Sequence, residues 1–99
     1  MNLKKYEDGD KLTIALSGKL NVLAVPELEA MINASVPTTS FLTFDFKECD
    51  YVSASGLRVL LGTFKTMKKE GKRMVLKNVG PIFTEVLENT CLDAVFDIE

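Results

Sequence analysis

Two serine hydroxyls and a glycine lie close together in the segment Val52-Ser53-Ala54-Ser55-Gly56-Leu57-Arg58. The preceding residues 41–46 are rich in aromatic side chains, which predicts a strand. From Leu57 to Met67 apolar residues recur at helical spacing, which predicts a helix with one buried face. The serines therefore lie at the start of a helix, where free backbone N–H groups and the helix dipole favour an anion. This position suits a phosphate group.

A serine at a helix start has a simpler role as well, which is to cap the helix. Ser53 is the better placed of the two serines for this cap or for a turn. Gly56 allows either close packing of the helix on the sheet or close approach of another protein to Ser55. One face of the helix carries four residues spaced at i, i+4, i+7 and i+11, which are Arg58, Gly62, Lys65 and Lys69. This face meets either solvent or a partner.

Composition limits the classes of function. Ninety-nine residues, of which 46% are hydrophobic and 26% charged, predict one globular domain over residues 1–99. The formal net charge of −2 gives no electrostatic reason to expect direct contact with nucleic acid or an anionic membrane. No apolar run approaches the ~20 residues that span a bilayer, and nothing at the amino end resembles a signal peptide. We therefore expect a cytoplasmic domain without a membrane partner.

The residue types argue against an enzyme. The chain has no histidine, which excludes a Ser-His hydrolase and a histidine-based metal site. Gly71-Lys72 does not form a phosphate-binding loop, because Thr66 stands where the first glycine of GxxxxGK belongs. Cys49 and Cys91 lack a CxxC spacing, which favours buried reduced thiols over a disulfide. We expect no catalytic residue, no metal and no cofactor.

Strands and helices alternate along the chain. A loop is predicted at residues 18–21, and the second helix is predicted to end near Gly71, a candidate left-handed cap. The predicted strands are an edge strand around residues 3–6, then residues 11–17, 41–46, 73–77 and a short closing strand at 94–96. The predicted helices run from residue 25 to before 37, for about sixteen residues from the Ser55 turn, and from 81 onward.

Such alternation in a short chain predicts an α/β domain. We expect a mixed, largely parallel sheet of four to five strands with helices packed against it and right-handed crossovers. Functional residues of such sheets gather beyond the carboxyl ends of the strands. The Ser55 turn and residues 78–80 are two of these loops.

Three segments together resemble the STAS domain family. They are Gly18-Lys19-Leu20-Asn21, Phe44-Asp45-Phe46 and the serine segment continued through Val59-Leu60-Leu61. STAS domains occur in anti-sigma factor antagonists and at the end of sulphate transporters. The resemblance covers the chain from the second predicted strand to the last helix, and the total length also fits the stand-alone antagonists.

The resemblance implies a STAS fold and a phosphorylation switch. In antagonists of this family, the serine before the glycine is phosphorylated by an anti-sigma factor that is also a serine kinase. The unmodified antagonist binds that kinase and frees a sigma factor, and a serine phosphatase restores the unmodified form. The matching serine here is Ser55, in a chain expected to be a monomer or weak dimer. The predicted partner-binding residues are Asn21, Ser53, Ser55, Gly56, Arg58, Gly62 and Lys65.

Two positions depart from the family pattern. Ser53 and Asn21 each replace a common aspartate, which removes negative charge beside Ser55 and makes Ser53 a second candidate acceptor. Two other functions stay open: a STAS subunit of another signalling or transport assembly, and a module that binds a small anionic ligand at the helix start.

Overall fold

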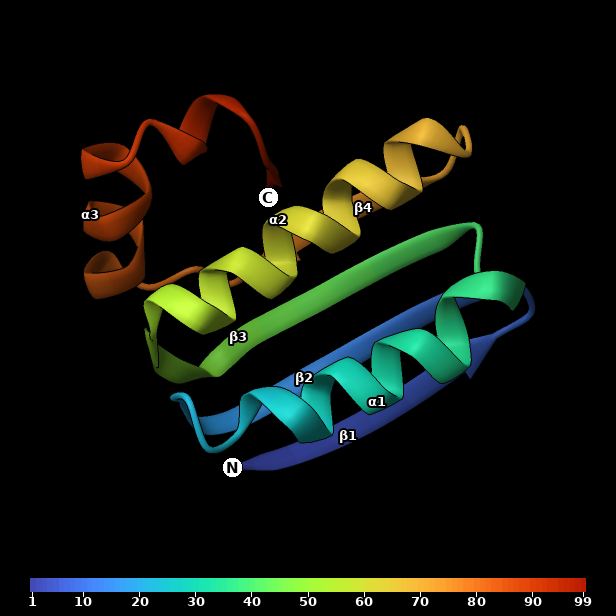
Figure 1. Cartoon of the computed structure of the whole chain (residues 1–99), viewed down its shortest axis with the longest axis horizontal. Helices are drawn as coiled ribbons and strands as arrows, with labels where there is room; N and C mark the ends of the chain where they lie inside the picture. Colours follow the sequence, from blue (N-terminus) through green and yellow to red (C-terminus); the bar gives the residue numbers. More distant parts are fainter.

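Five strands form one sheet in the order β1-β2-β3-β4-β5 in the computed structural model, which describes residues 1–99 (Figure 1). β1 (Asn2–Asp8) runs antiparallel to β2 (Lys11–Leu20). The remaining neighbours are parallel: β2 with β3 (Phe41–Val52), β3 with β4 (Arg73–Lys77), and β4 with β5 (Asp97–Ile98). The predicted mixed, largely parallel sheet is confirmed, including the edge strand at the amino end, and the structure shows that this strand is antiparallel to its neighbour.

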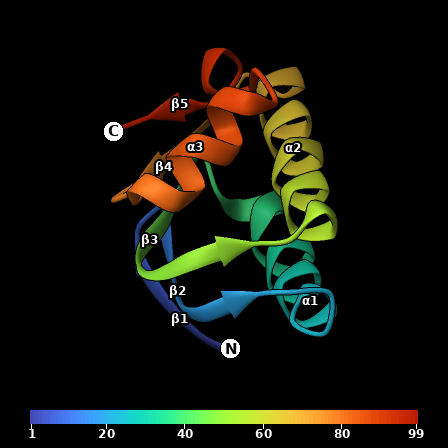
Figure 2. The same cartoon turned by 90° about the vertical axis from the view of Figure 1, so that its left-hand side faces the viewer.

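Three α-helices connect or follow the parallel strands. They are α1 (Val25–Ser35), α2 (Ala54–Lys69) and α3 (Pro81–Asn89), with short 3-10 helices at Val36–Thr38 and Leu92–Ala94. α1 and α2 lie side by side on one face of the sheet (Figure 2). None of these helices is long and apolar enough to cross a membrane.

The core lies between the sheet and these helices. In β2 the buried residues alternate with partly or fully exposed ones, which is the period of a strand with one covered face. α3 reaches the same core, where the rings of Phe46 and Phe83 have centroids 4.9 Å apart. The largest fully buried side chains are Phe44, Phe46, Phe83, Ile14, Leu16, Leu20, Leu28, Leu42, Leu60, Met67, Met74 and Leu76.

Three predicted boundaries were wrong. Residues 18–20 belong to β2 and not to a loop, because the strand continues through two register shifts around Ser17, with Gly18 at φ 105°. β3 extends past residue 46 to Val52, where exposed charged residues hide the strand pattern. Residues 94–96 form no strand: the chain makes the Leu92–Ala94 helical turn first, and β5 begins at Asp97.

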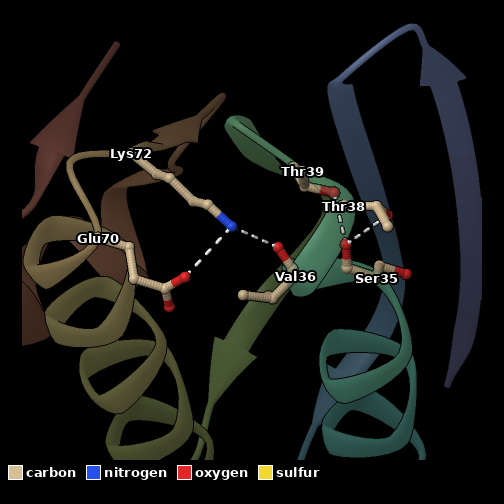
Figure 3. A network of polar contacts seen from close by, with 6 residues as sticks. All are labelled: Ser35, Val36, Thr38, Thr39, Glu70 and Lys72. Atoms are coloured by element: carbon tan, nitrogen blue, oxygen red, sulfur yellow. Dashed lines mark hydrogen bonds and ion pairs between the residues drawn. The ribbon is translucent and has the colours of Figure 1, made fainter.

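A polar network ties the end of α1 to the turn between α2 and β4 (Figure 3). Lys72 Nζ donates a hydrogen bond to the Val36 carbonyl at 2.9 Å and lies 3.4 Å from a carboxylate oxygen of Glu70. On the α1 side, the Thr39 hydroxyl donates to the Ser35 carbonyl at 2.7 Å. The Lys72–Val36 hydrogen bond joins the two sides at the end of the sheet away from the serine turn, and the other two contacts are local to one side each.

Removing the charged donor of this network will lower stability. We expect Lys72→Met to reduce the free energy of unfolding by about 1–2 kcal/mol, because the Val36 carbonyl loses a charged partner. Urea unfolding measures the difference. Lys69→Met, which removes an exposed lysine of the same region, serves as the control. Equal unfolding midpoints for the two variants would show that the network adds nothing.

Candidate functional site

Ser53 caps α2, as the sequence predicts. Its backbone is extended, with φ −72° and ψ 167°, and its side-chain oxygen accepts a hydrogen bond from the Gly56 N–H at 3.1 Å. Its carbonyl accepts the Leu57 N–H at 2.8 Å, which begins the helical pattern. The cap is therefore made by Ser53, and Ser55 is not needed for it.

Loss of this cap has a measurable cost. We expect Ser53→Ala to lower the free energy of unfolding by about 1 kcal/mol, because the Gly56 N–H loses its side-chain acceptor. Thermal or urea denaturation measures it. Ser40→Ala is the matched control, since the exposed Ser40 side chain makes no hydrogen bond. A Ser53→Ala chain as stable as that control would contradict the capping role.

Ser55 is the second residue of α2, and its hydroxyl is half-buried. Its Oγ lies 3.0 Å from Ser53 Oγ, within hydrogen-bond distance. Ser53 Oγ already accepts the Gly56 N–H, whereas Ser55 Oγ has the Ser53 hydroxyl as its one partner. Of the two serines, Ser55 is therefore the one with a hydroxyl that is oriented yet not committed to the backbone.

The absence of a side chain at Gly56 lets the serine turn pack closely on the end of β2. A Cβ atom at Gly56 would lie 2.9 Å from Cγ of Leu20 and 3.3 Å from its carbonyl oxygen. Leu20 is fully buried, and its carbonyl also accepts the Ser53 N–H at 2.8 Å. The missing side chain thus serves close packing, one of the two roles that the sequence leaves open for this glycine.

An open groove of about 530 Å³ separates α1 from α2 and begins at Ser55. It brings together three of the predicted partner-binding residues, Ser55, Arg58 and Gly62, while Lys65 lies outside it. Nothing lies within 4 Å of the place where a Cβ of Gly62 would stand. The full lining is Val25, Glu29, Ile32, Asn33, Val36, Ser55, Arg58, Val59, Gly62, Thr63 and Thr66.

Asn21 shapes the loop between β2 and α1. Its side-chain oxygen accepts hydrogen bonds from the Leu23 N–H at 3.1 Å and the Ala24 N–H at 3.2 Å. In the structure this side chain stabilises its own turn.

The same loop carries two residues that the sequence analysis did not select. Val22 is 65% exposed and Leu23 is 86% exposed, although both side chains are apolar. Their signal in the sequence is a pair of large aliphatic residues in a short loop at the carboxyl end of a strand.

Asp45 lies within β3, opposite Lys77 at the end of β4, and is outside the serine turn. It accepts hydrogen bonds from the Lys47 N–H at 3.0 Å and from the Asn78 side chain at 2.9 Å. Partial burial alone raises the pKa of this carboxyl, but these bonds and the charges of Lys77 and Lys47 lower it below its ordinary value. Asp45 therefore satisfies neighbouring donors and contributes to the fold.

The two cysteines are free thiols in different surroundings. Cys49 is buried in β3, and burial raises the pKa of its thiol above the ordinary value. Cys91 is exposed, which corrects the expectation that both thiols are buried. No group of three or more His, Cys, Asp or Glu side chains is arranged to hold a metal ion. The chemistry that this site offers is a serine hydroxyl at a helix start.

Comparison with known proteins identifies the family. The model of the STAS domain matches residues 2–99, nearly the whole chain. The chain belongs to the STAS domain family. This STAS domain is 24% identical over 98 residues to the anti-sigma-B factor antagonist of Bacillus subtilis, covering 99% of this chain and 90% of that protein. It is 26% identical over 96 residues to the antagonist of the same description from Listeria monocytogenes, covering 96% and 84%.

Solved structures share the fold. The phosphorylated form of the Bacillus cell fate determinant SpoIIAA superposes on this STAS domain with a TM-score of 0.80 at 19% identity, covering 99% of this chain and 91% of that one. The structure of a putative anti-sigma factor antagonist from Thermotoga maritima gives a TM-score of 0.90 at 14% identity, covering 97% and 84%. The expected STAS fold is therefore confirmed.

Proposed function

We propose that this STAS domain is an anti-sigma factor antagonist controlled by phosphorylation of Ser55. In its unmodified form it binds, in the cytoplasm, an anti-sigma factor that is a serine kinase, and this binding frees a sigma factor. Phosphate transfer to Ser55 ends the complex, and a serine phosphatase restores the unmodified chain. The domain itself is a substrate and a binding partner, not a catalyst.

The observation that carries the proposal is that the two serine hydroxyls have different hydrogen-bond partners. Ser53 Oγ is occupied by the Gly56 N–H, so phosphorylation of Ser53 would remove or distort the cap of α2. Ser55 Oγ is half-buried, oriented by Ser53 at 3.0 Å and free of backbone contacts. Ser55 is therefore the proposed acceptor, although Ser53 was the second candidate from sequence.

The relatives support the partner class. The relatives from Bacillus subtilis and Listeria monocytogenes, which match 99% and 96% of this chain, are anti-sigma-B factor antagonists. The similar SpoIIAA fold is known in unphosphorylated and phosphorylated forms. A fold that occurs in both forms is consistent with a switch in which phosphorylation changes the binding of the partner and leaves the fold in place.

Local electrostatics supports such a switch. A phosphate on Ser55 adds a charge of about −1.5 to −2 at pH 7. At the amino end of α2 the helix dipole favours this charge by about 0.3–1 kcal/mol, so the domain keeps its fold. A partner packed over Ser55 must instead bury the new charge or move away. Phosphorylation thus acts on the complex and not on the stability of the domain.

The other predicted contact residues fall into three groups. Arg58 and Gly62 line the groove that starts at Ser55, and we propose them as direct contacts for the kinase. Lys65 is exposed but outside the groove, so we assign it a peripheral contact at most. Asn21 and Gly56 act by holding the loops in place.

Recovery of the partner from native cell extract tests the proposal. Ser55→Ala and Ser55→Glu chains serve as baits, and the captured kinase is then purified and incubated with the unsubstituted chain and ATP. We expect the alanine bait to retain a serine kinase that the glutamate bait loses, and mass spectrometry to find the phosphate on Ser55. Ser40→Glu is the control, since it adds a negative charge at an exposed residue away from the acceptor and should still retain the kinase. Equal capture of a transporter or other signalling component by both baits would overturn the proposal.

A further inference from the structure

Val22 and Leu23 form an apolar tip on the loop between β2 and α1. Their exposed fractions are 65% and 86%, the two largest among the exposed large hydrophobic side chains. Single exposed apolar residues are ordinary on protein surfaces. Two adjacent ones, next to a candidate modification site, call for a partner that removes them from water.

The tip is held in one conformation. Asn21 Oδ1 accepts the backbone N–H groups of Leu23 and Ala24, and the Asn21 carbonyl also accepts the Ala24 N–H at 3.0 Å. Ala24 itself is buried, so the loop is anchored on the core directly after the tip. A preorganised apolar tip loses little conformational entropy on binding, which is the property of an interface anchor.

The tip is also adjacent to the acceptor serine. Leu20, the last residue of β2, bonds to the Ser53 N–H and packs against Gly56, so the loop leaves the sheet beside the serine turn. Val25, two residues after Leu23, lines the same groove as Ser55. Both views show the β2–α1 loop near the start of α2 (Figures 1 and 2). A protein that covers Ser55 therefore reaches Val22 and Leu23 as well.

We propose that Val22 and Leu23 are the docking anchor for the kinase that modifies Ser55, received by an apolar depression on that kinase. The inference rests on the proposed function and adds a specificity-determining contact to it. Asn21 is then a positioning residue, since it fixes the tip without itself meeting the kinase. The groove residues Arg58 and Gly62 would form the neighbouring part of the same interface.

Substitution of Leu23 tests the anchor. The probe is the purified kinase that phosphorylates Ser55, titrated against Leu23→Ser, Leu23→Met and Tyr6→Ser chains. Tyr6 is the matched control, because it is 57% exposed on β1 and pairs with Thr13 near the start of β2, whereas the tip follows the other end of that strand. We expect Leu23→Ser to raise Kd by about tenfold or more, and Leu23→Met and Tyr6→Ser to stay within about threefold of the unsubstituted chain.

Kinetics separates docking from chemistry. With Leu23→Ser the KM for Ser55 phosphorylation should rise about tenfold while kcat stays unchanged, because the tip contributes binding and not phosphate transfer. A Leu23→Ser chain that binds and is phosphorylated like the unsubstituted one would overturn the anchor and leave the proposed function intact. Equal weakening by Tyr6→Ser would also overturn it. If the unsubstituted chain is neither bound nor phosphorylated at Ser55 by any kinase, both proposals fall.

Discussion

Phosphorylation of Ser55 will weaken binding of the kinase by more than a hundredfold. A loss of only ~3 kcal/mol of binding free energy is enough for this change. The physical reason is that Ser55 is half-buried at the mouth of the α1–α2 groove, so a partner that seals the groove must desolvate the phosphate. Isothermal titration of the purified kinase with the unmodified and the phosphorylated chain measures the two dissociation constants.

Two controls separate this effect from a general effect of charge or of unfolding. Ser40→Glu adds a negative charge at an exposed residue before β3, and it should leave Kd within about twofold, as expected of a screened surface charge. The phosphorylated chain should also melt at the same temperature as the unmodified chain or slightly higher, because the charge lies at the favourable end of α2. Equal affinity of both forms for the kinase would refute the switch.

Gly56→Val will destabilise the domain by about 2 kcal/mol, within the range of about 1–3 kcal/mol typical of overpacking. The first side-chain carbon alone would come within 2.9 Å of Leu20 Cγ and 3.3 Å of the Leu20 carbonyl oxygen. Leu20 is fully buried and bonded through its carbonyl to Ser53, so it has no free direction in which to move. Urea denaturation measures the loss, and reduced phosphorylation of Ser55 should accompany it.

The matched control lies on the same helix. Gly62 is exposed, and a Cβ there would meet nothing within 4 Å. Gly62→Val should therefore change the free energy of unfolding by no more than about 0.5 kcal/mol, since valine is a somewhat better helix former than glycine. If both substitutions destabilise the domain equally, the close contact between Gly56 and Leu20 is not the cause.

The regular elements were predictable where the pattern is local. The strand at residues 73–77 and the sixteen-residue helix before it match the structure, because hydrophobic period and helix ends depend on neighbouring residues. The length of β2 was underestimated because two register shifts interrupt the alternation of its buried and exposed residues. β3 was underestimated because its second half, Lys47 to Val52, carries exposed polar residues that resemble a loop.

The local geometry of the candidate site was predictable for the same reason. A cap joins residues three apart, so the role of Ser53 and the availability of Ser55 follow from a short segment. The turn made by Asn21 is local too, since an asparagine side chain commonly accepts a hydrogen bond from the backbone two residues on.

The amino-acid sequence by itself determined the alternation of strands and helices, the family and the serine at a helix start. The tertiary structure alone decided which surfaces surround that serine. Gly56 contacts Leu20, which lies 36 positions earlier in the sequence. The groove lies between two helices, and no local sequence pattern indicates that these helices are neighbours. The exposure of Leu23 likewise depends on the tertiary structure, because no distant segment of the chain packs over this side chain. Such properties arise from packing between distant segments, and local periodicity carries no information about them.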